Sequence, residues 1–165
     1  MIEVQYMKFH DAHCHLQSKS FLKNFDIETS MKQWKKTGLE YLIGVSTKYS
    51  ESAEVIELSK KYNEIIPAIG IHPWSAKKKL EEDIKHDFIS LVRKNPNIVI
   101  GEIGLDHHFI TNQEYYSYQE EHLRFFLELS EKYHCPVNIH LKGAEKDVEE
   151  ILLNYKIPHQ KILIH

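Results

Sequence analysis

Short apolar segments alternate along the chain with longer segments in which apolar and polar residues are mixed. The six short segments are rich in β-branched or aromatic residues and are bounded by turn-forming residues, which is typical of β-strands. We therefore expect strands at residues 8–13, 41–46, 65–72, 97–105, 136–140 and 161–165.

The longer segments carry apolar residues three and four positions apart, which places these residues on one face of an α-helix. Asp26 and Ser50 are suited to cap the first two helices, Gly38 to end the first, and Pro96 to stop the third. The apolar faces expected to pack into the core are Ile27, Met31 and Trp34; Val55, Leu58 and Tyr62; Leu80, Ile84, Phe88, Leu91 and Val92; Leu123, Phe126, Leu127 and Ser130; and Val148, Ile151, Leu152 and Tyr155.

This alternation predicts an α/β protein with parallel strands and with helices packed outside the sheet. Each βα unit takes roughly 30 residues, the size of one unit of a (β/α)8 TIM-like barrel. Only about six units fit in 165 residues, whereas the barrel has eight. We therefore expect a single domain over residues 1–165 that is a C-terminally incomplete barrel. The edges of its first and last strands would be unpaired, and an oligomer formed through these edges is one alternative.

Composition narrows the classes of function. The chain has 21 basic and 24 acidic residues and a net charge of −3, so it lacks the basic surface on which non-specific polyanion binding depends. This does not exclude a nuclease, because bound divalent cations bring positive charge to a phosphate. No apolar run is long enough to span a bilayer, so we expect no membrane partner. Cys14 and Cys135 form no disulfide framework, which favours a reduced, cytoplasmic setting.

Histidine is the residue type in excess, with 12 copies, and several histidines lie where strands are expected to end. His13 and His15 are two positions apart in an extended segment, so both point to the same face. The carboxyl ends of parallel barrel strands open onto one mouth, where active sites lie. The sequence therefore predicts that five side chains meet there: His13, His15, Glu102, His140 and His165.

Imidazole and carboxylate groups in one place are typical of a metal site. They suit Zn²⁺, Mn²⁺, Fe²⁺ or Ni²⁺, and Mg²⁺ when water and substrate oxygens complete the shell. Five ligands with one shareable carboxylate indicate two divalent metal ions, which together can stabilise the attacking and leaving oxygens of a phosphoryl displacement. A single histidine at a strand end is more often a structural residue, so this prediction rests on the joint pattern.

Five motifs, in order along the chain, resemble the TatD family of metal-dependent deoxyribonucleases, which are amidohydrolase-like metallo-barrels. They are DAHCHL at 11–16, GIHPW at 70–74, GEIGLD at 101–106, PVNIH at 136–140 and ILIH at 162–165. The resemblance implies a (β/α)8-like barrel that hydrolyses phosphodiester bonds in DNA, often as a 3′→5′ exonuclease, with divalent ions such as Mg²⁺, Mn²⁺ or Zn²⁺.

The resemblance also implies a role for each matching residue. His13 and His15 would hold one ion, His140 and His165 would hold the second, and Glu102 would bridge both ions as the central catalytic residue. His72 would line the phosphate pocket. Lys142 stands where the family often has arginine, and it can still meet a phosphate as a point charge. A metal-binding aspartate that the family has further along its sequence is absent from these 165 residues.

Two other hypotheses remain open. A metallo-barrel hydrolase of amide or ester bonds shares the H-x-H start, but many such enzymes have a carbamylated lysine where this chain has Glu102, which favours the nuclease. The other is a metal-binding chain that is catalytically impaired because part of the barrel is missing.

Overall fold

The computed structural model describes residues 7–16 and 26–165, and the strands within these ranges form one six-stranded parallel sheet. The spatial order of the strands follows the chain. They are β1 (Phe9–Cys14), β2 (Leu39–Val45), β3 (Ile65–Ile69), β4 (Val99–Asp106), β5 (Val137–Lys142) and β6 (Ile162–Ile164). All six predicted strands are thus confirmed, with bounds shifted by a few residues, and β1 and β6 are the edges of the described sheet.

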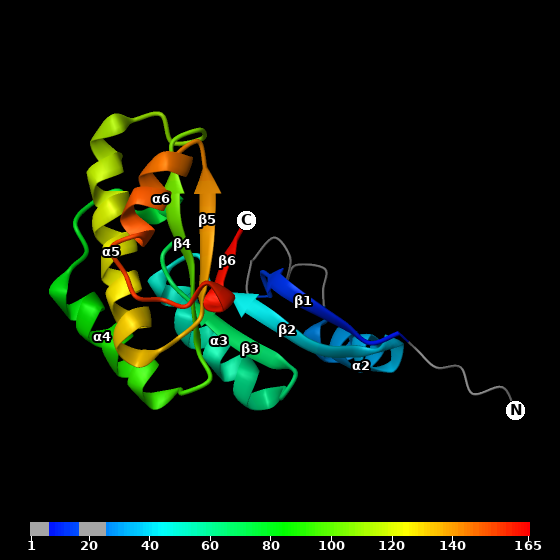
Figure 1. Ribbon diagram of the computed structural model, residues 1–165. Coiled ribbons are helices and arrows are strands. Elements are labelled where there is room, and N and C mark those ends of the chain that lie inside the picture. The colour runs from blue at the N-terminus through cyan, green and yellow to red at the C-terminus, as the bar shows by residue number, and fades with distance from the viewer. Residues whose placement is uncertain (1–6, 17–25) are drawn as a thin grey trace, which may run out of the picture.

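A helix lies in every connection between consecutive strands, and the sheet curls into an open half-barrel with the helices outside it (Figure 1). The main core lies between sheet and helices; in it, Ile100 and Ile103 of β4 are buried with Leu123 and Phe126 of the helix that follows β4. The helices are α2 (Ile27–Thr37), α3 (Tyr49–Lys61), α4 (Glu82–Lys94), α5 (Tyr116–Tyr133) and α6 (Glu145–Leu152), with single 3-10 turns at Pro73–Ser75, Gln113–Tyr115 and His159–Lys161.

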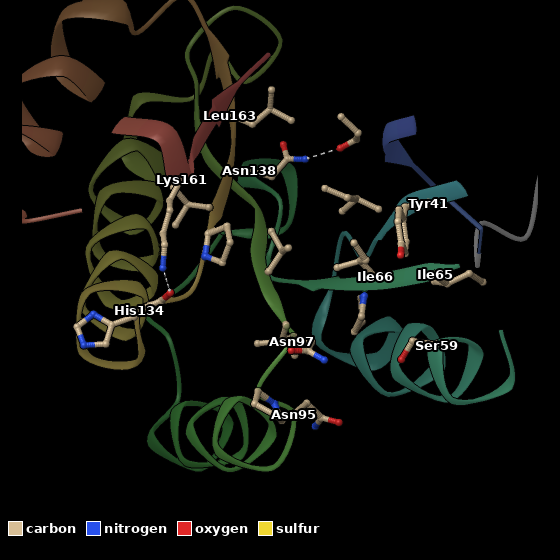
Figure 2. A pocket seen from close by; sticks show the side chains of 18 of the residues that line it. Tyr41, Ser59, Ile65, Ile66, Asn95, Asn97, His134, Asn138, Lys161 and Leu163 are labelled. Carbon is tan, nitrogen blue, oxygen red and sulfur yellow. Dashed lines mark hydrogen bonds between the residues drawn. The ribbon is translucent and has the colours of Figure 1, made fainter. Parts of the chain in front are cut away.

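The inner side of the sheet carries a smaller core of Val45, Ala68 and Val99. A hollow of about 1050 Å³ opens beside it, between the strands at the two ends of the sheet (Figure 2). Across this interior, the Asn138 side chain donates a hydrogen bond from Nδ2 to the carbonyl oxygen of Ala12, at 3.2 Å. One amide therefore joins β5 to β1.

The predicted ends of α2 are confirmed. The Asp26 side chain accepts a hydrogen bond from the N–H of Glu28, as an N-cap does, and Gly38 ends the helix with φ of +109°. A Cβ at Gly38 would lie 2.3 Å from the carbonyl oxygen of Met7, so this position requires glycine for both its backbone angle and its close packing.

The predicted cap at Ser50 is wrong. Helix α3 begins at Tyr49, and Lys48 precedes it without a side-chain cap. Glu51 in the first turn holds the preceding segment instead, because its Oε2 accepts hydrogen bonds from both the N–H and the hydroxyl of Thr47, at 2.9 and 2.8 Å. The start of the helix is therefore tied to the residue before its N-cap.

Further element ends differ from the prediction, and three of them bear on the core or the site. Strand β3 ends at Ile69, and His72, predicted as its last residue, instead caps the 3-10 turn Pro73–Ser75. Leu80 precedes α4 and Tyr155 follows α6, yet both pack on the main core. Apolar spacing identified Leu80 and Tyr155 as core residues but not the exact ends of the helices.

In the described parts of the chain, no helix combines the length and the apolar character that crossing a membrane would require.

Candidate metal centre

Side chains from five strands, or from the residues that follow them, converge at one end of the sheet. They are His13 and His15 at the end of β1, His72 after β3, Glu102 in β4, His140 in β5 and His165 after β6. Each imidazole has a ring nitrogen within 3.6 Å of a carboxylate oxygen of Glu102. We call these six residues the Glu102 cluster. All five predicted ligands lie in it, and so does His72.

Glycines on both sides of Glu102 allow β4 to approach β5 closely. A Cβ at Gly104 would lie 1.9 Å from the carbonyl oxygen of His140, and one at Gly101 would lie 2.6 Å from that of Asn138. Both glycines also have positive φ angles, +147° and +155°, which L-residues rarely adopt. The spacing of the GEIGLD motif thus sets the buried Glu102 carboxylate directly against the strand that carries His140.

The two oxygens of the Glu102 carboxylate face different histidines. Oε2 lies 3.6 Å from Nε2 of His13 and 3.5 Å from Nε2 of His15. Oε1 lies 3.3 Å from Nδ1 of His140 and 3.2 Å from Nε2 of His165. The carboxylate therefore lies between two pairs of imidazoles, as a carboxylate that bridges two cations must.

Hydrogen bonds on the far side of the rings determine which nitrogens of His13 and His15 are free. Nδ1 of His15 lies 3.1 Å from the carbonyl oxygen of Val45, which only accepts, so this nitrogen carries the proton. Because the Asn138 amide donates to Ala12, its Oδ1 faces Nδ1 of His13, at 3.4 Å, and accepts a hydrogen bond from it. A neutral imidazole has one N–H, so both Nε2 atoms present lone pairs, 3.1 Å apart.

His140 and His72 face Glu102 with different ring nitrogens. Nε2 of His140 donates to Oδ2 of Asp106 at 3.1 Å, which leaves its Nδ1 free toward Glu102. His72 has the same tautomer, because its Nδ1 accepts the backbone N–H of Trp74 at 3.1 Å. Its protonated Nε2, however, is the nitrogen that faces Oε1 of Glu102, 3.4 Å away. By distance alone His72 would fit a metal site with Glu102 and His140, but the nitrogen that it turns toward Glu102 is a hydrogen-bond donor.

The charges in the cluster favour a bound cation. Burial raises the pKa of the Glu102 carboxyl, but the interactions with His13, His140 and His72 outweigh burial and hold this pKa well below its usual range. Burial lowers the pKa values of His13 and His140, yet the nearby Glu102 carboxylate outweighs it and raises both. The carboxylate is therefore anionic, and its surroundings attract positive charge, which a metal ion can supply in place of protons.

One carboxylate oxygen of the Glu102 cluster lacks a hydrogen-bonding partner among the described residues. This atom, Oε2 of Glu102, is buried, and the nearest nitrogens are the free Nε2 atoms of His13 and His15. A buried carboxylate oxygen facing two lone pairs is costly unless a positive group lies among them. Imidazole nitrogen and carboxylate oxygen are donors that suit divalent transition metals, so the residues present fit such an ion.

The Glu102 cluster lines a hollow of about 690 Å³, together with Thr47, Lys48, Trp74, Ser75, Phe109, Leu141 and Lys142. Lys142 ends β5 and reaches the hollow, as predicted. No role was predicted for Trp74, Phe109 or Asn138. Strand alternation could have identified Asn138, because it lies two positions before His140 and shares its face. Trp74 ends the GIHPW motif, which could have indicated it, whereas Phe109 lies in none of the five motifs.

A protein-family model described as TatD related DNase matches residues 10–165. The chain belongs to this family. An uncharacterized metal-dependent hydrolase from Mycoplasma genitalium is 32% identical over 162 residues, covering 96% of this chain and 60% of that protein. A relative from Danio rerio, named "Putative deoxyribonuclease tatdn3", is 31% identical over 152 residues, covering 84% of this chain and 54% of that protein.

The crystal structure of YjjV, a TatD homolog from Escherichia coli K12, has the same fold. It matches with a TM-score of 0.77 and 25% identity, over 88% of this chain and 55% of that chain. The predicted α/β fold, a TIM-like barrel present as six βα units, is therefore confirmed. The chain spans little more than half the length of these TatD relatives.

Proposed function

We propose that this chain carries the metal-binding and phosphate-binding residues of a metal-dependent hydrolase that cleaves phosphodiester bonds in DNA. The observation that carries the proposal is the division of the Glu102 carboxylate between two histidine pairs. His13, His15 and Oε2 would hold one divalent cation, and His140, His165 and Oε1 would hold a second. Bound there, Mg²⁺, Mn²⁺ or Zn²⁺ would supply Lewis-acid stabilisation of negative charge on the phosphate.

The neighbouring side chains have matching roles. His72 holds a proton on Nε2 and can donate it in a hydrogen bond to a phosphate oxygen in the hollow, as the substrate-binding assignment predicts. Lys142 lines the same hollow and adds a positive charge. Asp106 holds the ring of His140 in place through Nε2, which leaves Nδ1 free for a cation.

DNA as the substrate is supported by the family description, TatD related DNase, and by the name of the relative from Danio rerio. A 3′→5′ exonuclease mode is part of the proposal through the family resemblance. A single, C-terminally incomplete domain over residues 1–165, a cytoplasmic location and an oligomer formed through the strand edges stay predictions.

The test is a cleavage assay on 5′-labelled single-stranded and duplex DNA, with Mg²⁺, Mn²⁺ or a chelator. We expect metal-dependent cleavage that falls more than about 100-fold in Glu102→Gln, because this variant replaces one oxygen of the carboxylate that both ions would share with an amide NH2 group and removes its negative charge. The matched control is Glu150→Gln on the exposed side of α6, which should cleave like the unmodified protein. Cleavage that survives Glu102→Gln, or hydrolysis of amide or carboxylic ester substrates in place of DNA, would contradict the proposal.

A further inference from the structure

Two large aromatic side chains lie at the surface beside the Glu102 cluster. Trp74 is 51% exposed and Phe109 is 61% exposed, and both line the hollow that contains the cluster. Their ring centroids are 6.1 Å apart and the ring planes are nearly perpendicular, at 87°. Exposed rings of this size leave much apolar area in water, so their position beside a polar, charged site needs a reason.

Both residues are held in place by one buried carboxylate. The indole N–H of Trp74 donates to Oδ2 of Asp106 at 2.7 Å, and the backbone N–H of Phe109 donates to Oδ1 of Asp106, also at 2.7 Å. Asp106 is fully buried and also accepts from His140. The indole of Trp74 and the backbone of Phe109 are therefore held beside the histidines that would hold the cations.

The surroundings of the rings limit the chemical class of ligand that can bind there. A charged phosphate would lie at the Glu102 cluster, where His72 and Lys142 also face the hollow. A group that packs on Trp74 and Phe109 must be flat and apolar on its faces and must be attached close to that phosphate. A nucleobase has these properties, and base stacking on aromatic side chains is a common way to bind unpaired strands.

We propose that Trp74 and Phe109 form a base-binding subsite for an unpaired nucleotide next to the phosphate held at the Glu102 cluster. This inference rests on the proposed function, since the phosphate must belong to a nucleic acid. It adds that the nucleotide bound here is unpaired, because a base that is paired and stacked inside a duplex presents only its edge to these rings.

The test compares two trinucleotides of equal charge in the presence of Mg²⁺: a thymidine trimer with phosphorothioate linkages, and its abasic counterpart with tetrahydrofuran spacers. Binding is followed by Trp74 fluorescence in a Trp34→Phe background, which leaves Trp74 as the single tryptophan, and by calorimetry. We expect the trimer with bases to quench Trp74 and to bind about tenfold more tightly than the abasic one.

Variants at Phe109 separate stacking from structural effects, because the Asp106 contact of this residue uses its backbone. Phe109→Leu is expected to weaken the trimer with bases about tenfold and leave the abasic trimer unchanged, whereas Phe109→Tyr retains both affinities. The control is Tyr41→Leu. Tyr41 is an exposed aromatic residue that lines the hollow on the inner side of the sheet, so this variant should change neither affinity.

Equal binding of the two trimers, or an equal loss of both in Phe109→Leu, would overturn the subsite and leave the proposed function in place. Failure of both trimers to bind to protein that binds Mg²⁺ would overturn the nucleic-acid function itself, and the subsite with it.

Discussion

Replacing Asn138 with leucine is expected to weaken metal binding about tenfold, although Asn138 lies in neither histidine pair. Its amide has two hydrogen bonds: Nδ2 donates to Ala12, and Oδ1 accepts from Nδ1 of His13. The second bond keeps the proton on Nδ1 and the lone pair of Nε2 directed at the site. Leucine has a similar size but no acceptor, so both tautomers of His13 become accessible.

The size of the effect follows from the geometry. Loss of a hydrogen bond to a ligand histidine typically costs about 10- to 100-fold in metal affinity. The bond from His13 to Asn138 is 3.4 Å long, beyond the usual range of about 2.7–3.2 Å, so we expect the lower end, about tenfold or 1.4 kcal/mol. Asn138→Asp keeps an acceptor for His13 and is the matched control, with metal affinity at or above that of the unmodified protein.

Two measurements check this prediction. Calorimetric titration with Zn²⁺ gives the affinities, and long-range ¹H–¹⁵N NMR spectra of the metal-free protein show which nitrogen of His13 carries the proton. We expect the Nδ1–H form in the unmodified protein and a mixture in Asn138→Leu. Unchanged affinity in a folded Asn138→Leu protein, or an Nε2–H form of His13 in the unmodified protein, would refute the reasoning.

Three further predictions concern positioning, acid stability and the core. Asp106→Asn is expected to weaken metal binding about tenfold, because the ring of His140 loses its anionic partner; calorimetry showing no change would contradict this. Burial lowers the pKa of His122, so the unfolded chain binds that proton more strongly and stability falls as the pH drops through about 6.5. Melting temperatures of His122→Gln should therefore fall less than those of the unmodified protein between pH 7.5 and 5.5, and equal falls would disprove the assignment. Phe88→Ala removes a fully buried ring that contacts Phe126, and urea unfolding should show a loss of about 3–5 kcal/mol, with a loss below 1 kcal/mol contradicting the described core.

The strands and the convergence of five residues in the Glu102 cluster could be predicted because each depends on a local pattern. The alternation of side chains along an extended strand places His13 and His15 on one face, and parallel strands bring their carboxyl ends to one edge. These two rules, applied also to Glu102, His140 and His165, are enough to predict that the five residues lie together.

The parts that could not be predicted depend on contacts between distant segments. The donor role of His72 follows from the backbone N–H of Trp74, which faces His72 only because β3 ends early and a 3-10 turn follows. Similarly, nothing near Trp74 and Phe109 in the sequence indicates that one carboxylate, Asp106, holds both. Tautomers and ring positions are set by tertiary neighbours, which apolar spacing does not specify.

The most direct test of the account is the number of divalent ions bound per chain, measured by calorimetric titration with Mn²⁺ and confirmed by metal analysis. We predict two ions in the unmodified protein, one in His15→Ala, and the loss of both sites in Glu102→Gln, because glutamine replaces one of the two oxygens that each serve a histidine pair and removes the negative charge that both ions would share. Absence of Mn²⁺ binding to the folded protein, or equal binding in the Glu102→Gln variant, would contradict the central claim that Glu102 organises a two-metal site.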